Sequence, residues 1–134
     1  CFLSFIRVPL IGQKSALAIE IVSHSETLDW YHEADLFAFA SSCETFGISL
    51  LEAMASGLPI ACSDRGPMPE VLKDAGVYFN PENPSSIAAS LKVLLKDESL
   101  RENLGRKALS LSQAFKWERC AQETFSFLSS FYKH

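Results

Sequence analysis

Apolar residues along this chain form short continuous runs that alternate with segments of helical character. Three runs are nearly all apolar, as in strands covered on both faces: residues 35–40, 58–62 and 77–79. Between them, helix signals occupy 47–56, which Gly57 closes as a C-cap, and 69–74. This alternation predicts an α/β fold of the Rossmann-like type, with a parallel sheet and helices on both of its faces.

The two ends of the chain extend this pattern in different ways. Residues 18–22 are predicted as a short strand, and 27–34 as a helix whose apolar face includes Tyr31. After the last strand, three successive helices are expected, the last over about 117–132. No repeat or internal linker interrupts residues 1–134, so we expect a single domain.

Composition and charge place the chain among soluble globular domains. Hydrophobic residues make up 48% of its 134 residues and charged residues 21%. The formal net charge of −4 argues against a nucleic-acid partner, which would normally select a basic surface. No apolar run approaches the length of a membrane span, and no basic leader is recognisable, so a cytoplasmic location is expected. Because the chain starts at a cysteine, it is expected to be a piece of a longer protein.

Cysteine and histidine give little support for a metal site. The four cysteines lie far apart, without a C-x-x-C pair, and the chain has three histidines. Cys43 and Cys62 stand beside apolar strand residues, so both are expected to be buried, reduced thiols.

Two acids flank a turn that opens the helix predicted at 47–56. Glu44 precedes the Phe46-Gly47 turn and Glu52 lies in the second helical turn, so both are near the positive N-terminal end of the helix. Backbone N–H groups there could bind the phosphates of an anionic ligand while the acids bind its hydroxyls, which favours a nucleotide-activated sugar. The alternative is an exposed acid, an acid stabilised by the helix dipole, and an ordinary glycine turn.

Several segments resemble those of one known family. Residues 34–41 resemble its Ala-Asp strand that ends in Ser, and 44–59 resemble its long signature: Glu, seven residues, Glu, then Ala-Met-Ala-x-Gly-x-Pro. Three later landmarks are also similar: residues 63–71, 79–81 and 115–118. From Leu28 onward, the chain thus resembles the C-terminal, donor-binding domain of a family 4 retaining glycosyltransferase with the GT-B fold (glycosyl transferases group 1).

The resemblance implies a nucleotide-sugar donor site at the carboxyl ends of the strands. Glu44 corresponds to the catalytic acid that faces the transferred sugar, and Glu52 to the acid that binds the ribose hydroxyls. The donor-binding residues between them include those whose backbone N–H groups contact the diphosphate and sugar: Thr45, Phe46, Gly47 and Ile48. The resemblance also implies transfer with retention of anomeric configuration, without a bound metal or another cofactor.

The resemblance also indicates what the sequence lacks. The family's N-terminal acceptor-binding domain is not recognisable, so the chain is expected to be truncated on its N-terminal side and inactive when isolated. The family's basic pair for the diphosphate has no counterpart, because Arg7 and Lys14 stand in different surroundings. The expected partners are a nucleoside diphosphate sugar and the missing domain, with no nucleic acid and no transmembrane segment; a peripheral membrane contact of the parent protein stays open.

Two alternative functions and one surface remain open at this point. A non-catalytic module that binds nucleotide sugars would also suit a chain without the basic pair. A GT-B sugar-nucleotide epimerase would need a His and Glu pattern that this sequence does not have. The aromatic residues near the C-terminus, such as Phe115, Phe125 and Phe131, either pack on this domain's own core or dock on the missing domain, as the resemblance implies.

Overall fold

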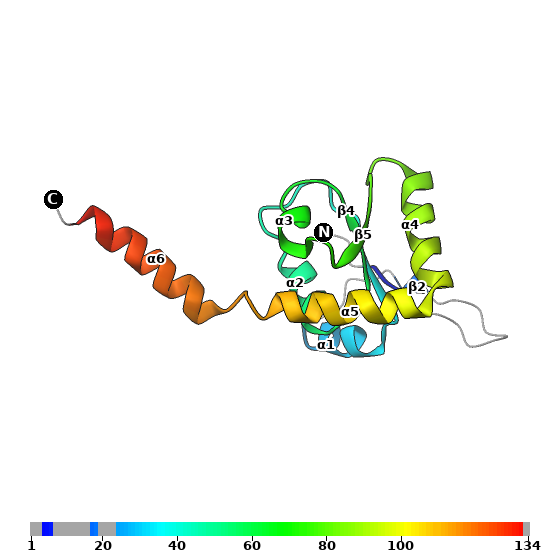
Figure 1. The fold of residues 1–134 in the computed structure, drawn as a ribbon, viewed down its shortest axis with the longest axis horizontal. Coiled ribbons are helices and arrows are strands. Elements are labelled where there is room, and N and C mark those ends of the chain that lie inside the picture. Colours follow the sequence, from blue (N-terminus) through cyan, green and yellow to red (C-terminus); the bar gives the residue numbers. More distant parts are fainter. Residues whose placement is uncertain (1–3, 7–16, 19–23, 133–134) are drawn as a thin grey trace.

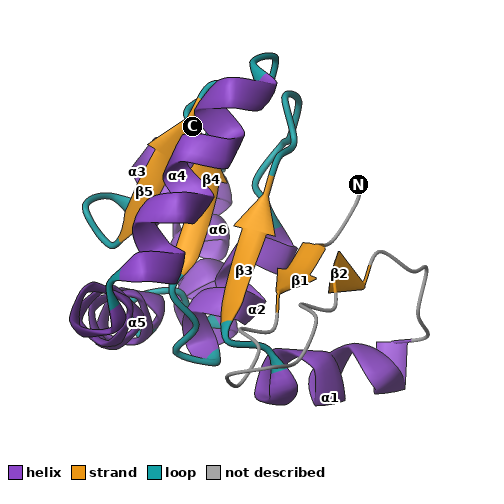
Figure 2. Cartoon of the chain, turned by 90° about the vertical axis from the view of Figure 1, so that its right-hand side faces the viewer, coloured by secondary structure: helices purple, strands orange, loops and turns teal. Residues whose placement is uncertain are grey.

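The computed structural model describes residues 4–6, 17–18 and 24–132, which form one sheet with helices on both faces (Figure 1, Figure 2). The sheet has the strand order β2-β1-β3-β4-β5. Its strands are β1 (Ser4–Ile6), β2 (Leu17–Ala18), β3 (Leu36–Phe39), β4 (Ile60–Ser63) and β5 (Gly76–Phe79). The helices are α1 (His24–Glu33), α2 (Ile48–Ala55), α3 (Met68–Leu72), α4 (Pro84–Lys96), α5 (Glu98–Ser112) and α6 (Trp117–Phe131).

The three strands β3, β4 and β5 are parallel, as the sequence predicts, but β1 and β2 are not. β1 is antiparallel to both β2 and β3. The connection from β1 to β2 spans residues 7–16, which is shorter than the dozen or more residues that a parallel crossover needs. Of the strand predicted at 18–22, only residue 18 is within the described part of the chain.

The side chains of each parallel strand alternate between two hydrophobic clusters, one on each face of the sheet. On β3, Phe37 and Phe39 pack with α2 and α3, whereas Leu36 and Ala38 pack with Leu94 of α4. All four β3 side chains are buried, because helices cover both faces. The predicted two-sided arrangement is therefore confirmed for the parallel part of the sheet.

Helix α2 agrees with its predicted position. It ends at the C-cap Ser56, and the next residue, Gly57, has a φ of +71°. A left-handed glycine directly after the last turn is the usual way for a helix to end, so the predicted termination by glycine is confirmed.

Helix α5 crosses over the turn that joins α2 to β4. A Cβ atom on Gly105 would lie 2.3 Å from the carbonyl oxygen of Gly57, so this crossing depends on direct contact between two backbones. The next turn of α5 then places Ala108 in the core beside α2 and α3. Glycine at position 105 therefore sets the distance between α5 and the rest of the fold.

Helix α6 projects away from the body of the molecule (Figure 1). It has no buried residue, and Trp117 and Phe125 are 78% and 69% exposed. Packing of this helix on the domain's own core, one of the two expectations from the sequence, is therefore wrong; Phe127 and Phe131 instead contact each other, with ring centroids 4.9 Å apart. Neither α6 nor any other helix in the described ranges is long and apolar enough to cross a membrane.

Candidate functional site

The carboxyl ends of β3, β4 and β5 lie at one edge of the sheet, here called the carboxyl edge. Residues 40–47, the site loop, leave β3 at this edge and lead into α2. The loop after β4 lies against them, because a Cβ atom on Gly66 would be 3.7 Å from the carbonyl oxygen of Glu44. The segment singled out by the sequence is thus located where ligands bind in open α/β sheets.

Helix α2 begins without a side chain to cap it. Its N-cap is Gly47, in the left-handed conformation (φ 83°, ψ 58°), and no side-chain hydrogen bond closes the first turn. The helical hydrogen bonds start with the N–H groups of Leu50 and Leu51, which donate to the carbonyl of Gly47 at 3.0 and 3.3 Å. The backbone N–H groups before them have no partner within the helix and suit an anionic ligand.

The conformation of Gly47, rather than lack of space, is what requires glycine at this position. A Cβ atom there would meet Leu50 and Phe39 at 3.6 Å, which is ordinary van der Waals contact. The φ of 83° is the obstacle, because L-residues with a side chain rarely adopt it. The left-handed turn alone therefore accounts for glycine at this position.

The other predicted residues surround the start of α2 with graded exposure. Glu44 is half-buried and Thr45 is exposed. Phe46 and Ile48 are 41% and 58% exposed, high values for apolar side chains. Apolar surface and an acid therefore lie together beside the uncapped N–H groups.

Phe46 also contacts a residue distant in sequence. Its ring lies 6.0 Å from that of Phe115, edge to face, just after the end of α5. Each ring is only partly covered, with 41% of Phe46 and 39% of Phe115 exposed. Of the aromatic residues noted near the C-terminus, Phe115 thus packs on the site loop, an arrangement that the sequence alone did not indicate.

Glu52 is held by a tyrosine from α1. The Tyr31 hydroxyl lies 3.0 Å from Glu52 Oε2 and 3.1 Å from the carbonyl oxygen of Ser49. Burial, together with the negative charge of Glu52, raises the pKa of the Tyr31 phenol above its ordinary range, so the phenol remains a donor. The sequence argument placed Tyr31 on an apolar helix face; the buried hydroxyl, which needs a partner, is the signal it missed.

A cation also lies at the carboxyl edge. Arg65 follows β4 by two residues, and its Nε is 3.3 Å from a carboxylate oxygen of Asp64. Its backbone N–H donates to the hydroxyl of the buried Ser63 at 3.2 Å. Arg7 and Lys14, the basic residues considered from the sequence, lie outside the described residues.

The two cysteines expected to be buried differ in the structure. Cys62 is fully buried in β4, and burial raises the pKa of its thiol to about 12. Cys43 is exposed, so the expectation of a buried thiol is wrong for this residue. The reason is that β3 ends at Phe39 and Cys43 belongs to the site loop, beyond the covered part of the strand. Within the described residues, no three His, Cys, Asp or Glu side chains converge as a metal site would require.

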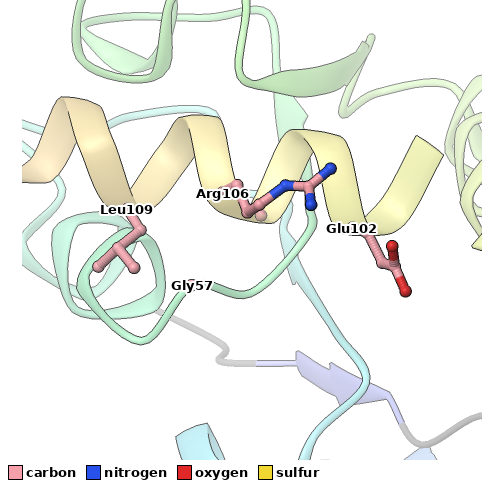
Figure 3. Close-up of a pocket in the computed structure, with 5 residues that line it drawn as sticks. Gly57, Glu102, Arg106 and Leu109 are labelled. Atoms are coloured by element: carbon pink, nitrogen blue, oxygen red, sulfur yellow. The ribbon is translucent and has the colours of Figure 1, made fainter. Parts of the chain in front are cut away.

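A separate hollow of about 410 Å³ lies at the opposite edge of the sheet. It is formed by the turn before β4 and by α5, and Figure 3 shows Arg106 and Glu102 projecting from α5, with Leu109 beside Gly57. None of the residues predicted to bind the donor lines it. We refer to it as the α5 hollow.

Comparison with known proteins shows that the chain is similar to glycosyltransferases. The family model described as Glycosyl transferases group 1 matches residues 14–110. The O-antigen chain mannosyltransferase B of Escherichia coli is 36% identical over 96 residues, covering 72% of this chain and 25% of that protein. The sulfoquinovosyl transferase SQD2 of Arabidopsis thaliana is 33% identical over 92 residues, covering 65% of this chain and 18% of that protein.

Solved structures agree with this match. The C-terminal domain of a glycosyl transferase group 1 family protein (LpcC) from Francisella tularensis has a TM-score of 0.63 and 31% identity, covering 71% of this chain and 50% of that chain. Sucrose-phosphate synthase from Thermosynechococcus elongatus has a TM-score of 0.74 and covers 83% of this chain and 29% of that chain; at 24% identity it shows a shared fold. The chain spans about a quarter of the length of the first curated relatives it matches. It belongs to the glycosyl transferases group 1 family and has the Rossmann-like architecture of the GT-B fold.

Proposed function

We propose that this chain binds a nucleoside diphosphate sugar at the carboxyl edge and forms the donor-binding part of a retaining glycosyltransferase. The observation that carries the proposal is the uncapped start of α2, with Glu44 before it and Glu52 one turn inside it. The names of the relatives, a mannosyltransferase and a sulfoquinovosyl transferase, support sugar transfer as the reaction class. In this proposal the backbone N–H groups of residues 46–48 bind the diphosphate, and the carboxylates of Glu44 and Glu52 bind the sugar hydroxyls.

The backbone at the start of α2 would bind the diphosphate. When the glycosidic bond to the donor breaks, negative charge accumulates on the departing diphosphate. N–H groups at Phe46, Gly47 and Ile48, held by the turn and by the start of the helix, stabilise that charge without having to reorganise. A single well-placed donor of this kind is worth about 3–4 kcal/mol in the transition state. Thr45, exposed in the same loop, completes the set of donor-binding residues.

The two acids would have separate roles. Glu44, half-buried in the site loop, faces the transferred sugar and offsets the positive charge that develops at its anomeric carbon. Glu52 accepts hydrogen bonds from the ribose hydroxyls, which are strong because the acceptor is charged. We propose that binding needs no metal, so that EDTA leaves the affinity unchanged.

A nucleotide-sugar binding module without transfer is the second candidate. The feature that favours it is the basic pair for the diphosphate, for which the sequence shows no recognisable counterpart. Both candidates share the same donor site, and they differ in whether Glu44 acts on a reacting sugar. Because the isolated chain is expected to be inactive, transfer from a radiolabelled nucleotide sugar distinguishes them when the chain is joined to an acceptor-binding domain; a pure binding module retains the donor intact even then.

Calorimetric titration with UDP, GDP and their sugars tests the donor site. We expect weak binding of one nucleoside diphosphate, lost in Glu52→Ala because the ribose loses its acceptor. The matched control is Glu102→Ala, which removes an exposed acid from the α5 hollow and should leave the affinity unchanged. If Glu102→Ala abolished binding and Glu52→Ala did not, the ligand would occupy the α5 hollow and the proposed site would be wrong.

A further inference from the structure

The hydroxyl of Tyr31 links α1 to the acid on α2. The Tyr31 side chain is 2% exposed, and its ring lies 5.8 Å from that of Phe37 in the core. Its hydroxyl reaches Glu52 Oε2 at 3.0 Å and the carbonyl oxygen of Ser49 at 3.1 Å. A phenol carries one donor hydrogen, so these two acceptors, both on the face of α2 that meets α1, share it.

The ring of Tyr31 and its hydroxyl contribute differently to the fold. Phenylalanine would fill the same volume and keep the contact with Phe37. The hydroxyl adds a hydrogen bond of 3.0 Å to a carboxylate, and a charged acceptor makes such a bond stronger than one between neutral groups. The hydroxyl is therefore the part of this side chain that acts on Glu52 rather than on packing.

We infer that Tyr31 is a positioning residue for the donor site, because its hydroxyl holds Glu52 in the orientation that accepts the ribose hydroxyls. This inference rests on the proposed function. A carboxylate has about four acceptor positions, so one phenol leaves capacity for a sugar diol. A glutamate side chain without this bond would lose conformational entropy when the ligand binds. Because Tyr31 already orders Glu52 in the free protein, that entropy is not lost on binding.

Tyr31→Phe tests the inference, with UDP and GDP compared with their 2′,3′-dideoxy forms by calorimetry. We expect the affinity for the ribonucleotide that binds to fall roughly tenfold, the amount that ordering one flexible side chain can cost. The affinity for its dideoxy form should not change, because that form offers Glu52 no hydroxyl. If Tyr31 only stabilised the fold, Tyr31→Phe would lower the affinity for both nucleotide forms equally. A loss restricted to the ribonucleotide therefore distinguishes positioning of Glu52 from a general structural role.

Tyr78→Phe is the matched control. The Tyr78 hydroxyl donates to the carbonyl oxygen of Lys73, away from the two acids, so removing it makes the same chemical change without touching Glu52. This variant should bind both nucleotide forms like the unmodified chain. Circular dichroism of both variants verifies that each remains folded.

Each result has a defined meaning. If the unmodified chain binds neither UDP nor GDP, the proposed function fails and the inference fails with it. If it binds one of them but Tyr31→Phe leaves the preference for ribose unchanged, the donor site stands and the inference is overturned. Equal affinity of the unmodified chain for the ribose and dideoxy forms also overturns it, since Glu52 would then not bind the ribose.

Discussion

Helices α2 and α4 both begin at the carboxyl edge of the sheet, yet they begin in opposite ways. Helix α4 starts at Asn83, whose side chain accepts hydrogen bonds from the N–H groups of Ser85 and Ser86 at 3.0 and 3.3 Å. Helix α2 starts at Gly47, which has no side chain to offer. One helix start is thus capped by a side chain, and the other has no side-chain cap.

The contrast sets a structurally capped helix start beside the one at which we propose that the ligand binds. Asparagine and aspartate at an N-cap stabilise a helix by about 1 kcal/mol, and α5 has the same device in Asp97, which accepts from Leu100 at 2.9 Å. Helix α2 has glycine at its N-cap, which gives up roughly a few tenths of a kcal/mol of that stabilisation and supplies no side-chain acceptor. Its start is flanked by Glu44 and Glu52, so the stability lost at this helix coincides with the site that we propose.

The largest expected effect comes from Gly47→Ala. Forcing an L-residue into the left-handed conformation costs about 1–2 kcal/mol of stability, and relief of that strain would turn the first N–H groups of α2 away from the ligand. We therefore expect nucleoside diphosphate affinity to fall by more than roughly tenfold, as judged from the value of one well-placed donor. Chemical denaturation and calorimetry measure the two effects.

Gly57→Ala provides the matched control at the other end of α2. Gly57 also has a positive φ, +71°, and a Cβ atom there would meet only Leu109, at 3.9 Å. The loss of stability should be similar, about 1–2 kcal/mol, with nucleotide affinity retained. Equal losses of affinity in both variants would indicate a general effect of strain on α2 and contradict a special role for its start.

A smaller effect is expected from Asn83→Ala. Removing this cap leaves the first N–H groups of α4 without their acceptor and should lower the free energy of unfolding by about 1 kcal/mol. Nucleotide affinity should not change, because we place the ligand at α2. A marked loss of binding in this variant would mean that the ligand extends to α4, and the contrast between the two helix starts would no longer hold.

The smallest expected effect is on thiol labelling. Cys43 in the site loop and Cys120 on α6 are both exposed, whereas Cys62 is buried and its raised pKa keeps it protonated. A saturating nucleoside diphosphate should slow maleimide labelling of Cys43 severalfold and leave that of Cys120 unchanged, since only Cys43 adjoins the proposed ligand. Mass spectrometry of the peptides follows each cysteine; equal protection of both would point to a global change.

Much of the fold could be predicted from the sequence because the strands that matter are buried on both faces. The near-continuous apolar runs identify β3, β4 and β5, and the helices between them make these strands parallel. The antiparallel edge could not be predicted in the same way. β1 and β2 are three and two residues long, so local pattern gives little information about their direction.

The sequence predicted which segment forms the candidate site, but not which distant residues pack against it. The Glu44-to-Glu52 spacing around Gly47 follows from the order of the residues alone. The contacts of Tyr31 with Glu52 and of Phe115 with Phe46 join positions far apart in the chain, and they depend on how α1 and α5 pack. Cys43 was misjudged because an apolar neighbourhood in sequence does not indicate where a strand ends.

The backbone contact between Gly105 and Gly57 affects how variation within this family should be interpreted. Any larger residue at position 105 would separate α5 from the turn before β4, since its Cβ would come within 2.3 Å of a carbonyl oxygen. We therefore expect selection to preserve this glycine as strictly as an acid of the donor site. In an alignment, Gly105 and the acids of the proposed donor site would then look equally invariant. The glycine would be kept for helix packing at one edge of the sheet and the acids for ligand binding at the other, and only their location in the fold distinguishes the two reasons.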